Sequence, residues 1–152
     1  MLAATALGFP VVLIPICIVS MVVFYLKNNY KVSEAFFVAL LSMGVNSFLK
    51  LFIHRTRPDT LYVGAMRFKT YSFPSGHSFG AMVLYGLITY LLYNYLPQPW
   101  NIVAVVVGIL IILSIGISRI YLGAHFPTDV VGGWVFGAVA LALIIVFIKP
   151  SL

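Results

Sequence analysis

The chain has 152 residues, of which 62% are hydrophobic and 8% charged, and it carries a net charge of +6. Its mean hydropathy is +1.11. Soluble domains contain roughly 45–50% apolar residues, so this composition excludes an ordinary soluble globular protein. It also argues against a nucleic-acid-binding protein, because no basic run or basic–aromatic pattern stands outside the apolar segments. A single cysteine, Cys17, rules out an intrachain disulfide.

Five apolar segments follow one another along the chain, each long enough or nearly long enough to cross a bilayer, which takes about 20 residues. They cover residues 7–26, 35–53, 78–96, 102–118 and 130–148. The first is expected to be a retained span and not a secretory signal, because no basic region precedes it and its apolar stretch is too long. The sequence therefore predicts an all-α, polytopic membrane bundle of about five transmembrane helices, with residues 1–152 forming one domain.

Spans that alternate in direction divide the connections between the two sides of the membrane. Residues 27–34 and the turn at 97–99 fall on one side, and residues 54–76 and 118–129 fall on the other. By the positive-inside tendency, the first side is expected to be cytoplasmic, because it carries Lys27, Lys31 and Lys149. The other side also holds basic residues, so charge is a weak guide to orientation unless those residues bind a substrate.

The second apolar segment ends in a basic cluster. Lys50 and Arg57 are seven residues apart, nearly two helical turns, so they project from one side of a helix that continues that far. Pro58 disfavours helical geometry at Arg57, so the helix is expected to end near there. Lys50 then lies about 10 Å deeper than Arg57, at about 1.5 Å per residue, which is deeper than a residue at the membrane edge needs to be. We expect Lys50 and Arg57 to serve a site, and Arg55 only to snorkel at the edge.

The third apolar segment opens with Pro74, Ser75, Gly76 and His77. Free N–H groups at the start of a helix bind anions, and the helix dipole adds to the attraction. Ser75 can cap the helix or donate its hydroxyl to a phosphate oxygen, and Gly76 lets a ligand approach the backbone. Pro-Ser-Gly alone would indicate only helix initiation. The imidazole of His77, whose ordinary pKa lies near neutral pH, favours a functional site.

The connection between the fourth and fifth segments places Arg119, His125 and Asp129 in an otherwise apolar stretch. Ionisable groups at membrane depth are costly and by default indicate function. His125 and Asp129 are four residues apart and can lie together on a helix or turn. A carboxylate bonded to one imidazole nitrogen leaves the other free to act as nucleophile or base. All three clusters fall on the same side of the membrane, so together they predict an anion site. His54 is expected to lie at the membrane interface without a role in that site.

These clusters resemble the signature motifs of the type 2 phosphatidic acid phosphatase (PAP2) superfamily of membrane lipid phosphatases, which is related to the vanadium haloperoxidases. Residues 50–58 fit the pattern K-x6-R-P, residues 74–77 fit P-S-G-H, and residues 118–129 fit S-R-x5-H-x3-D. Each motif is complete and the three stand in the family's order. The resemblance covers residues 50–129 and implies a PAP2-like helical core and a metal-independent phosphatase.

The resemblance also implies a role for each motif residue. His125 would attack phosphorus and form a phosphohistidine, Asp129 would orient it, and His77 would protonate the leaving group. The phosphate oxygens would be held by Lys50, Arg57, Ser75, Gly76 and Arg119. No metal or other cofactor is expected, because cations and backbone amides can neutralise the developing charge. The remaining acids, Glu34 and Asp59, are too far from Asp129 in sequence to suggest a magnesium site.

The chain departs from bacterial members of the family, which commonly have six spans with the first motif at the end of the third. Here that motif ends the second segment, so the first helix is expected to be missing and the N-terminus to lie on the side of the site. One wall of the substrate groove would then come from a partner subunit or from nothing. The spacings Gly133-x-x-x-Gly137 and Gly76-x-x-x-Gly80 permit close helix contact, and we favour contact within the chain over contact in a homo-oligomer.

The leading hypothesis is an integral-membrane enzyme that hydrolyses a lipid phosphate: a prenyl pyrophosphate such as undecaprenyl pyrophosphate, phosphatidic acid or phosphatidylglycerophosphate. The resemblance implies a bacterial plasma membrane with the site on the extracytoplasmic face, among membrane lipids and without nucleic acid. One alternative is a phosphotransferase, in which an alcohol or sugar replaces water. Another is a non-enzymatic anion transporter or lipid-binding protein. The loop 55–73, with Arg67 and Lys69, is expected either to read the head group or to be a solvated loop.

Overall fold

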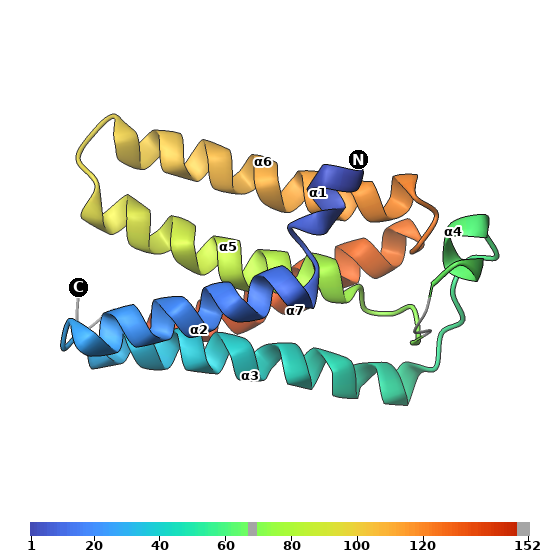
Figure 1. The fold of residues 1–152 in the computed structure, drawn as a ribbon, viewed down its shortest axis with the longest axis horizontal. Helices are drawn as coiled ribbons and strands as arrows, with labels where there is room; N and C mark the ends of the chain where they lie inside the picture. The colour runs from blue at the N-terminus through green and yellow to red at the C-terminus, as the bar shows by residue number, and fades with distance from the viewer. Residues whose placement is uncertain (67–69, 149–152) are drawn as a thin grey trace.

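The computed structural model describes residues 1–66 and 70–148 (Figure 1). In these two ranges the chain forms seven helices and no strand: α1 (Leu2–Ala6), α2 (Pro10–Leu26), α3 (Tyr30–Ile53), α4 (Leu61–Gly64), α5 (Gly76–Tyr95), α6 (Trp100–Tyr121) and α7 (Pro127–Ile148). The prediction of an all-α fold is confirmed. Arg67, Lys69 and Lys149, to which the sequence assigned possible roles, lie outside the described residues.

Three of the long helices, α3, α6 and α7, are long and apolar enough to cross a membrane. Helix α2 is also apolar but has only 17 residues. Helix α5 has 20 residues and falls outside this set, because tyrosines and a polar first turn lower its hydropathy. Large apolar side chains cover the outer surfaces of these helices, with Val11 77% exposed and Leu143 69% exposed. An apolar outer surface of this extent indicates an integral membrane protein.

The first apolar segment is divided, whereas the sequence predicted one span over residues 7–26. The short helix α1 ends at Ala6, and α2 begins at Pro10, the first helical position, where proline is well tolerated. Between them the chain bends at Gly8. A Cβ atom at Gly8 would lie 2.7 Å from Ile115 Cγ2 and 2.9 Å from His77 Cδ2, so only glycine lets the chain pass this close to α5 and α6.

Helix α3 ends at Ile53, four residues before the end that the sequence predicted near Arg57. The residue that follows, His54, has a left-handed backbone with φ of 49°, and its N–H donates to the carbonyl of Lys50 at 3.2 Å. This is a common way for a helix to end, because a left-handed residue cannot continue the turn. Arg57 therefore belongs to the loop after α3 and does not share a helix face with Lys50.

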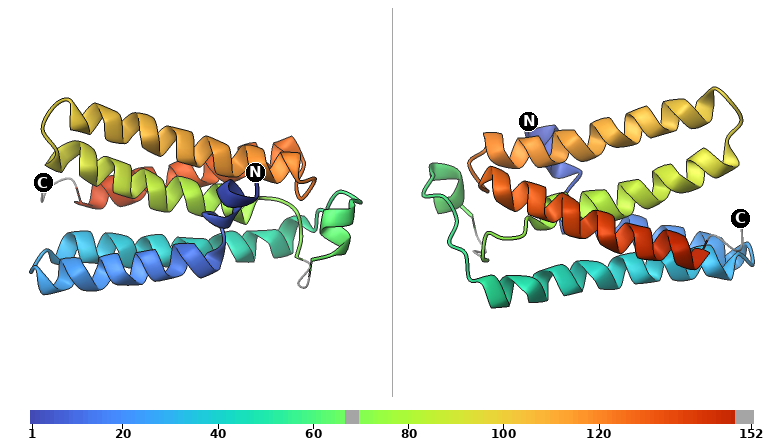
Figure 2. Two further views of the ribbon diagram at one scale, coloured as in Figure 1. Left: turned by 45° about the horizontal axis from the view of Figure 1, so that its top comes forward. Right: turned by 180° about the vertical axis from the view of Figure 1, so that it is seen from behind.

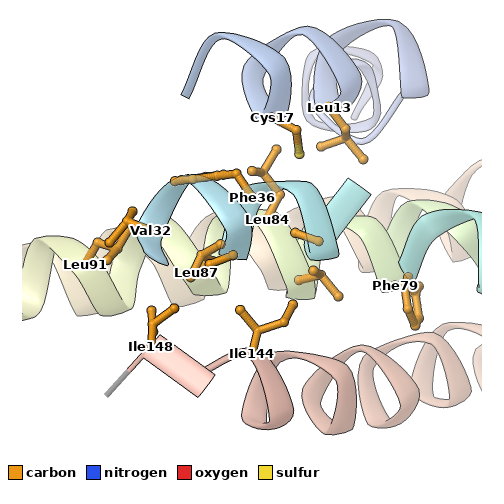
Figure 3. Close-up of a cluster of buried hydrophobic side chains, with 13 residues drawn as sticks. Leu13, Cys17, Val32, Phe36, Phe79, Leu84, Leu87, Leu91, Ile144 and Ile148 are labelled. Carbon is orange, nitrogen blue, oxygen red and sulfur yellow. The ribbon is translucent and has the colours of Figure 1, made fainter. Parts of the chain in front are cut away.

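Helix α5 lies at the centre of the bundle and packs against α2, α3, α6 and α7 (Figures 1 and 2). Several of its apolar side chains are fully buried, including Val83, Leu84 and Leu87. Figure 3 shows Leu84 and Leu87 with side chains from α2, α3 and α7, among them Phe36 and Ile144, in one apolar cluster. Because lipid tails are as apolar as these side chains, the cluster stabilises the bundle by close packing rather than by escape from water.

Glycines on α7 bring that helix close to α5. A Cβ atom at Gly133 would lie 2.7 Å from the carbonyl oxygen of Ser75, and one at Gly137 would lie 3.0 Å from that of Phe79. Both neighbours are backbone atoms, which cannot move aside cheaply. The Gly133-x-x-x-Gly137 spacing thus serves packing between two helices of the same chain, as the sequence favoured.

The connections that carry the predicted site gather at one end of the bundle (Figure 1). The end of α3, the helix α4, the start of α5 and the junction of α6 with α7 all lie there, and Figure 2 shows the same end from behind. The turns at 27–29 and 96–99 lie at the opposite end, together with the end of α7. This confirms, for the described residues 54–66, 70–76 and 118–129, that the two connections share one side, as alternating helices require.

We expect the substitution Gly133→Ala to destabilise the bundle by about 1–3 kcal/mol, the usual cost of forcing a methyl group into a packed interior. Thermal unfolding in detergent micelles measures the change. Gly44→Ala on α3 is the matched control, since a Cβ atom there has no neighbour within 4 Å. That control should leave stability unchanged or raise it by about 0.5–1 kcal/mol, because alanine favours the helix. Equal effects of the two substitutions would contradict the close contact between α5 and α7.

Candidate active site

His125 lies in the short connection between α6 and α7 and is almost completely buried. Its Nε2 atom is 3.2 Å from Nη1 of Arg57, and its Nδ1 atom is 3.4 Å from Oδ2 of Asp129. A guanidinium group can only donate, so Nε2 must accept and the imidazole proton belongs on Nδ1, facing the carboxylate. This is the arrangement in which Nε2 offers a lone pair for attack or for taking a proton.

The Asp129 carboxylate stands in the first turn of α7, fully buried, and is bound on both oxygens. Oδ2 accepts from the backbone N–H of Phe126 at 2.9 Å and from the hydroxyl of Ser72. Oδ1 accepts from Nη1 of Arg55 at 2.9 Å. The carbonyl of Asp129 also accepts from the N–H of Ser75 at 2.9 Å, which joins the start of α7 to the start of α5. The predicted pairing of His125 with Asp129 is therefore present, with more partners than the sequence indicated.

Arg55 was expected only to snorkel at the membrane edge, and that prediction is wrong. Besides its ion pair with Asp129, it donates to the hydroxyl of Thr128 at 2.7 Å and lies over the ring of Phe126, 4.5 Å from the centroid. The reason is the early end of α3: Arg55 lies in the loop that follows Ile53, and from that loop its side chain reaches the first turn of α7. Ser72 was also missed, and nothing in its sequence position relates it to Asp129.

Lys50, in the last turn of α3, is buried and points at the loop before α5. Its Nζ atom donates to three backbone carbonyls, those of Tyr71 at 3.0 Å, Ser72 at 3.4 Å and Pro74 at 2.5 Å. Three carbonyl dipoles solvate the ammonium group without neutralising it. The charge of Lys50 is thus held beside the loop that leads into α5.

Helix α5 begins where the sequence predicted. Ser75 is its N-cap, and the Ser75 hydroxyl oxygen accepts from the N–H of Ser78 at 3.4 Å. A Cβ atom at Gly76 would have only Asn46 Nδ2 nearby, at 3.5 Å, so the space over the first turn stays open. His77 follows, with its Nε2 buried and without a hydrogen-bond partner and its ring edge-on to Phe9 at 4.8 Å between centroids. A buried imidazole nitrogen without a partner needs an explanation, and a bound ligand supplies one.

Arg119 lies in the last turn of α6 and is buried. Its Nη1 donates to the hydroxyl of Thr5 at 2.6 Å and to that of Tyr62 at 3.2 Å, and its guanidinium lies 5.5 Å from the centre of the Tyr62 ring. Its Nε is buried without a partner. Through Thr5 and Tyr62, the helices α1 and α4 therefore both contact Arg119. The sequence did not predict that Thr5 would lie at the site.

The motif residues form one electrostatic group. Arg119, Arg57 and Lys50 all lie near enough to act on His77 through their charges, and His125 lies among them. Asp129 is the only carboxylate among these groups, and it is already paired with Arg55. The remaining cations have carbonyl and hydroxyl partners but no counter-ion among residues 1–66 and 70–148. Lys50 and Arg119 are buried and Arg57 is half-buried, and a set of cations like this without a counter-ion favours an anion strongly.

Burial lowers the pKa of His125 to about 4; the nearby Arg57, Lys50 and Arg119 cations act the same way, while the hydrogen bond to Asp129 opposes them. The imidazole is therefore neutral at neutral pH, which is the state a nucleophile needs.

As for metals, no three His, Cys, Asp or Glu side chains come together as a possible metal site in the part of the chain that the structure describes.

Comparison with known proteins identifies relatives. The profile of the PAP2 superfamily matches residues 31–151. Phosphatidylglycerophosphatase B of Bacillus subtilis (strain 168) is 40% identical over 103 residues, which cover 66% of this chain and 49% of that protein. Lipid A 1-phosphatase of Rhizobium johnstonii is 32% identical over 126 residues, or 77% of this chain and 48% of that protein. Undecaprenyl-diphosphatase of Sulfolobus acidocaldarius is 38% identical over 69 residues, or 45% of this chain and 29% of that protein.

A solved structure resembles the whole bundle. The crystal structure of a transmembrane PAP2 type phosphatidylglycerolphosphate phosphatase from Bacillus subtilis superposes with a TM-score of 0.85 at 31% identity. The match covers 99% of this chain and 75% of that one. The chain spans about half the length, or less, of the curated relatives it matches.

We expect His125 to titrate near pH 4 and not near the ordinary value of about 6.5, so that it is neutral from about pH 5 upward, with its proton on Nδ1. Nitrogen-15 NMR of histidine-labelled protein in micelles measures both the tautomer and the titration, and His125→Gln identifies the signal by removing it. A titration near pH 6.5, or a proton on Nε2, would contradict the assigned geometry.

Proposed function

The chain belongs to the PAP2 superfamily, and we propose that it is an integral-membrane phosphatase that hydrolyses a lipid phosphate or pyrophosphate. The observation that carries the proposal is the buried, neutral His125, whose Nε2 faces Arg57 beside a group of cations without a counter-ion. The three curated relatives named above are all phosphatases or diphosphatases by name.

In the proposed reaction, Nε2 of His125 attacks phosphorus and the bond from phosphorus to the leaving oxygen breaks. Asp129 stabilises the positive imidazole that results, through the proton on Nδ1. The negative charge of the bound phosphate favours a proton on Nε2 of His77, and His77 donates that proton to the leaving oxygen. Water then attacks the phosphohistidine and gives its proton to His77, the P–N bond breaks, and inorganic phosphate leaves with both histidines restored.

The phosphate oxygens would take the place of the present partners of the cations. Arg57 would turn its Nη1 from Nε2 to a phosphate oxygen, which frees the lone pair of His125. Lys50 and Arg119 would contribute charge, and the hydroxyl of Ser75 and the open backbone at Gly76 would complete the site. Each cation about 4 Å from an oxygen contributes roughly 4 kcal/mol before desolvation, at an effective dielectric constant of about 20. Three such contacts can stabilise the transition state without a divalent cation.

The substrate is proposed to be an amphiphile whose tail stays in the bilayer. The site lies at the end of helices with apolar outer faces, so a lipid phosphate can reach it without leaving the membrane. Phosphatidylglycerophosphate is the first candidate, because one curated relative and the solved relative are named for it. Prenyl pyrophosphates and phosphatidic acid are the other candidates to test.

The proposed membrane arrangement has five spans in one domain. Helices α2 and α5 run beside α3 and α7, so they would cross with them although they fall outside the set that is long and apolar enough by itself. The site would lie on the extracytoplasmic face of a bacterial plasma membrane, with Lys27 and Lys31 at the cytoplasmic end.

The substitution His125→Ala should lower the rate of phosphate release at least about 1,000-fold, because it removes the nucleophile. Asp129→Asn should lower kcat by a similar order and leave binding of the substrate nearly unchanged. Colorimetric phosphate release from phosphatidylglycerophosphate, prenyl pyrophosphates and phosphatidic acid in micelles measures both. Ser33→Ala, a buried serine at the far end of α3, should have normal activity.

The same assay separates the proposal from its alternatives. Free phosphate as sole product, with glycerol or sugar added as acceptor, supports hydrolysis; a phosphorylated acceptor indicates a transferase. If both the wild type and His125→Ala bind phosphate but neither releases phosphate from a lipid, the protein is a non-enzymatic anion or lipid binder. Undiminished release by His125→Ala would overturn the mechanism.

Activity should be the same with and without a chelator such as EDTA, since the three cations can perform the task of a metal ion. The rate of phosphate release from a purified, metal-stripped sample measures this, and the same sample with added Mg²⁺ is the control. An activity that depends strictly on Mg²⁺ would contradict the proposal that the cationic side chains stabilise the transition state without a metal ion.

A further inference from the structure

Ser72 lies in the loop before α5, fully buried, and joins two of the three motif clusters. Its N–H donates to the carbonyl of Arg55 at 2.7 Å, and its own carbonyl accepts from Nζ of Lys50 at 3.4 Å. Its hydroxyl contacts Oδ2 of Asp129 and lies 3.3 Å from Nδ1 of His125. The backbone of Ser72 is thus held by the first motif, while its side chain contacts the third.

The direction of each hydrogen bond follows from the protons available. The carboxylate of Asp129 can only accept, so the single hydroxyl proton of Ser72 goes to Oδ2. The oxygen lone pair of Ser72 is then left facing Nδ1 of His125. The Nδ1 proton therefore has two acceptors, the hydroxyl oxygen of Ser72 at 3.3 Å and Oδ2 of Asp129 at 3.4 Å.

We propose that Ser72 is a positioning residue for this reaction: its hydroxyl orients the Asp129 carboxylate and, with it, the His125 ring whose Nε2 attacks phosphorus. Arg55 acts on the other carboxylate oxygen, so that neither oxygen can rotate away from its place. The inference rests on the proposed function, since it concerns the same nucleophile. Ser72 stands outside the motif residues of the sequence analysis and does not touch the phosphorus itself.

Removal of the hydroxyl should have two effects. The ring of His125 loses one of its two acceptors and the carboxylate loses a donor, so the ring is less well aimed and kcat falls. The carboxylate, less satisfied, also binds the Nδ1 proton more strongly and favours the protonated imidazole, which raises the pKa of His125. The other charged and titratable groups that face His125 stay the same: Lys50 on α3, Arg57 in the loop, His77 on α5, Arg119 on α6 and Asp129 on α7.

The test compares Ser72→Ala and Ser72→Cys with the wild type. Cysteine nearly keeps the volume but donates only weakly, so it preserves the fold if alanine does not. We expect kcat to fall about 10- to 100-fold in both, the usual worth of one hydrogen bond to a charged group, with KM nearly unchanged. The acid limb of the pH profile of kcat/KM should move up by about one pH unit. Ser33→Ala is the matched control, a buried serine that donates to a backbone carbonyl far from the site.

A kcat within about twofold of wild type would overturn the inference, and so would a fall in kcat with an unmoved acid limb, which a merely structural serine would give. The nitrogen-15 titration of His125 provides a readout without turnover. If the wild type hydrolyses no lipid phosphate but the pKa of His125 still rises in Ser72→Ala, the proposed function fails and the positioning role stands. If the wild type is active and the titration does not move, the positioning role fails alone.

Discussion

The buried carboxylate of Asp129 is the constraint on which the site depends. A charge without water must be paired and hydrogen-bonded, or it is too costly to keep. Here its partners come from three separate stretches of chain: Arg55 after α3, Ser72 before α5 and the backbone of Phe126 before α7. Each of those stretches must therefore close over the start of α7. The position of His125 follows from the same contacts.

The backbone of Ser75 takes part both in the packing of α7 on α5 and in the candidate site. The carbonyl of Ser75 lies where a side chain at Gly133 would stand, and the N–H of Ser75 donates to the carbonyl of Asp129. The close approach of α7 to α5 thus sets the distance between the start of α5 and the carboxylate. Lys50 adds a third tie by binding the carbonyls of the loop that leads into α5.

Much of this could be predicted from the sequence. Apolar length predicted where the long helices lie, and three of them, α3, α6 and α7, are long and apolar enough to cross a membrane. Ser75 marked the start of α5 through its local chemistry. The end of α3 was misplaced, since the left-handed turn at His54 has no strong signal in a residue that is neither glycine nor asparagine. That error hid Arg55. Ser72 could not be found, because its contacts arise only when three loops are brought together.

The first nine residues have a practical consequence. The hydroxyl of Thr5 accepts a hydrogen bond from Arg119, and Gly8 and Phe9 lie close to His77. The end of α7 lies at the opposite end of the bundle. Any sequence joined ahead of Leu2 emerges beside the candidate site. An affinity tag or a fluorescent fusion placed there would disturb that site, so a purification tag is better joined after α7.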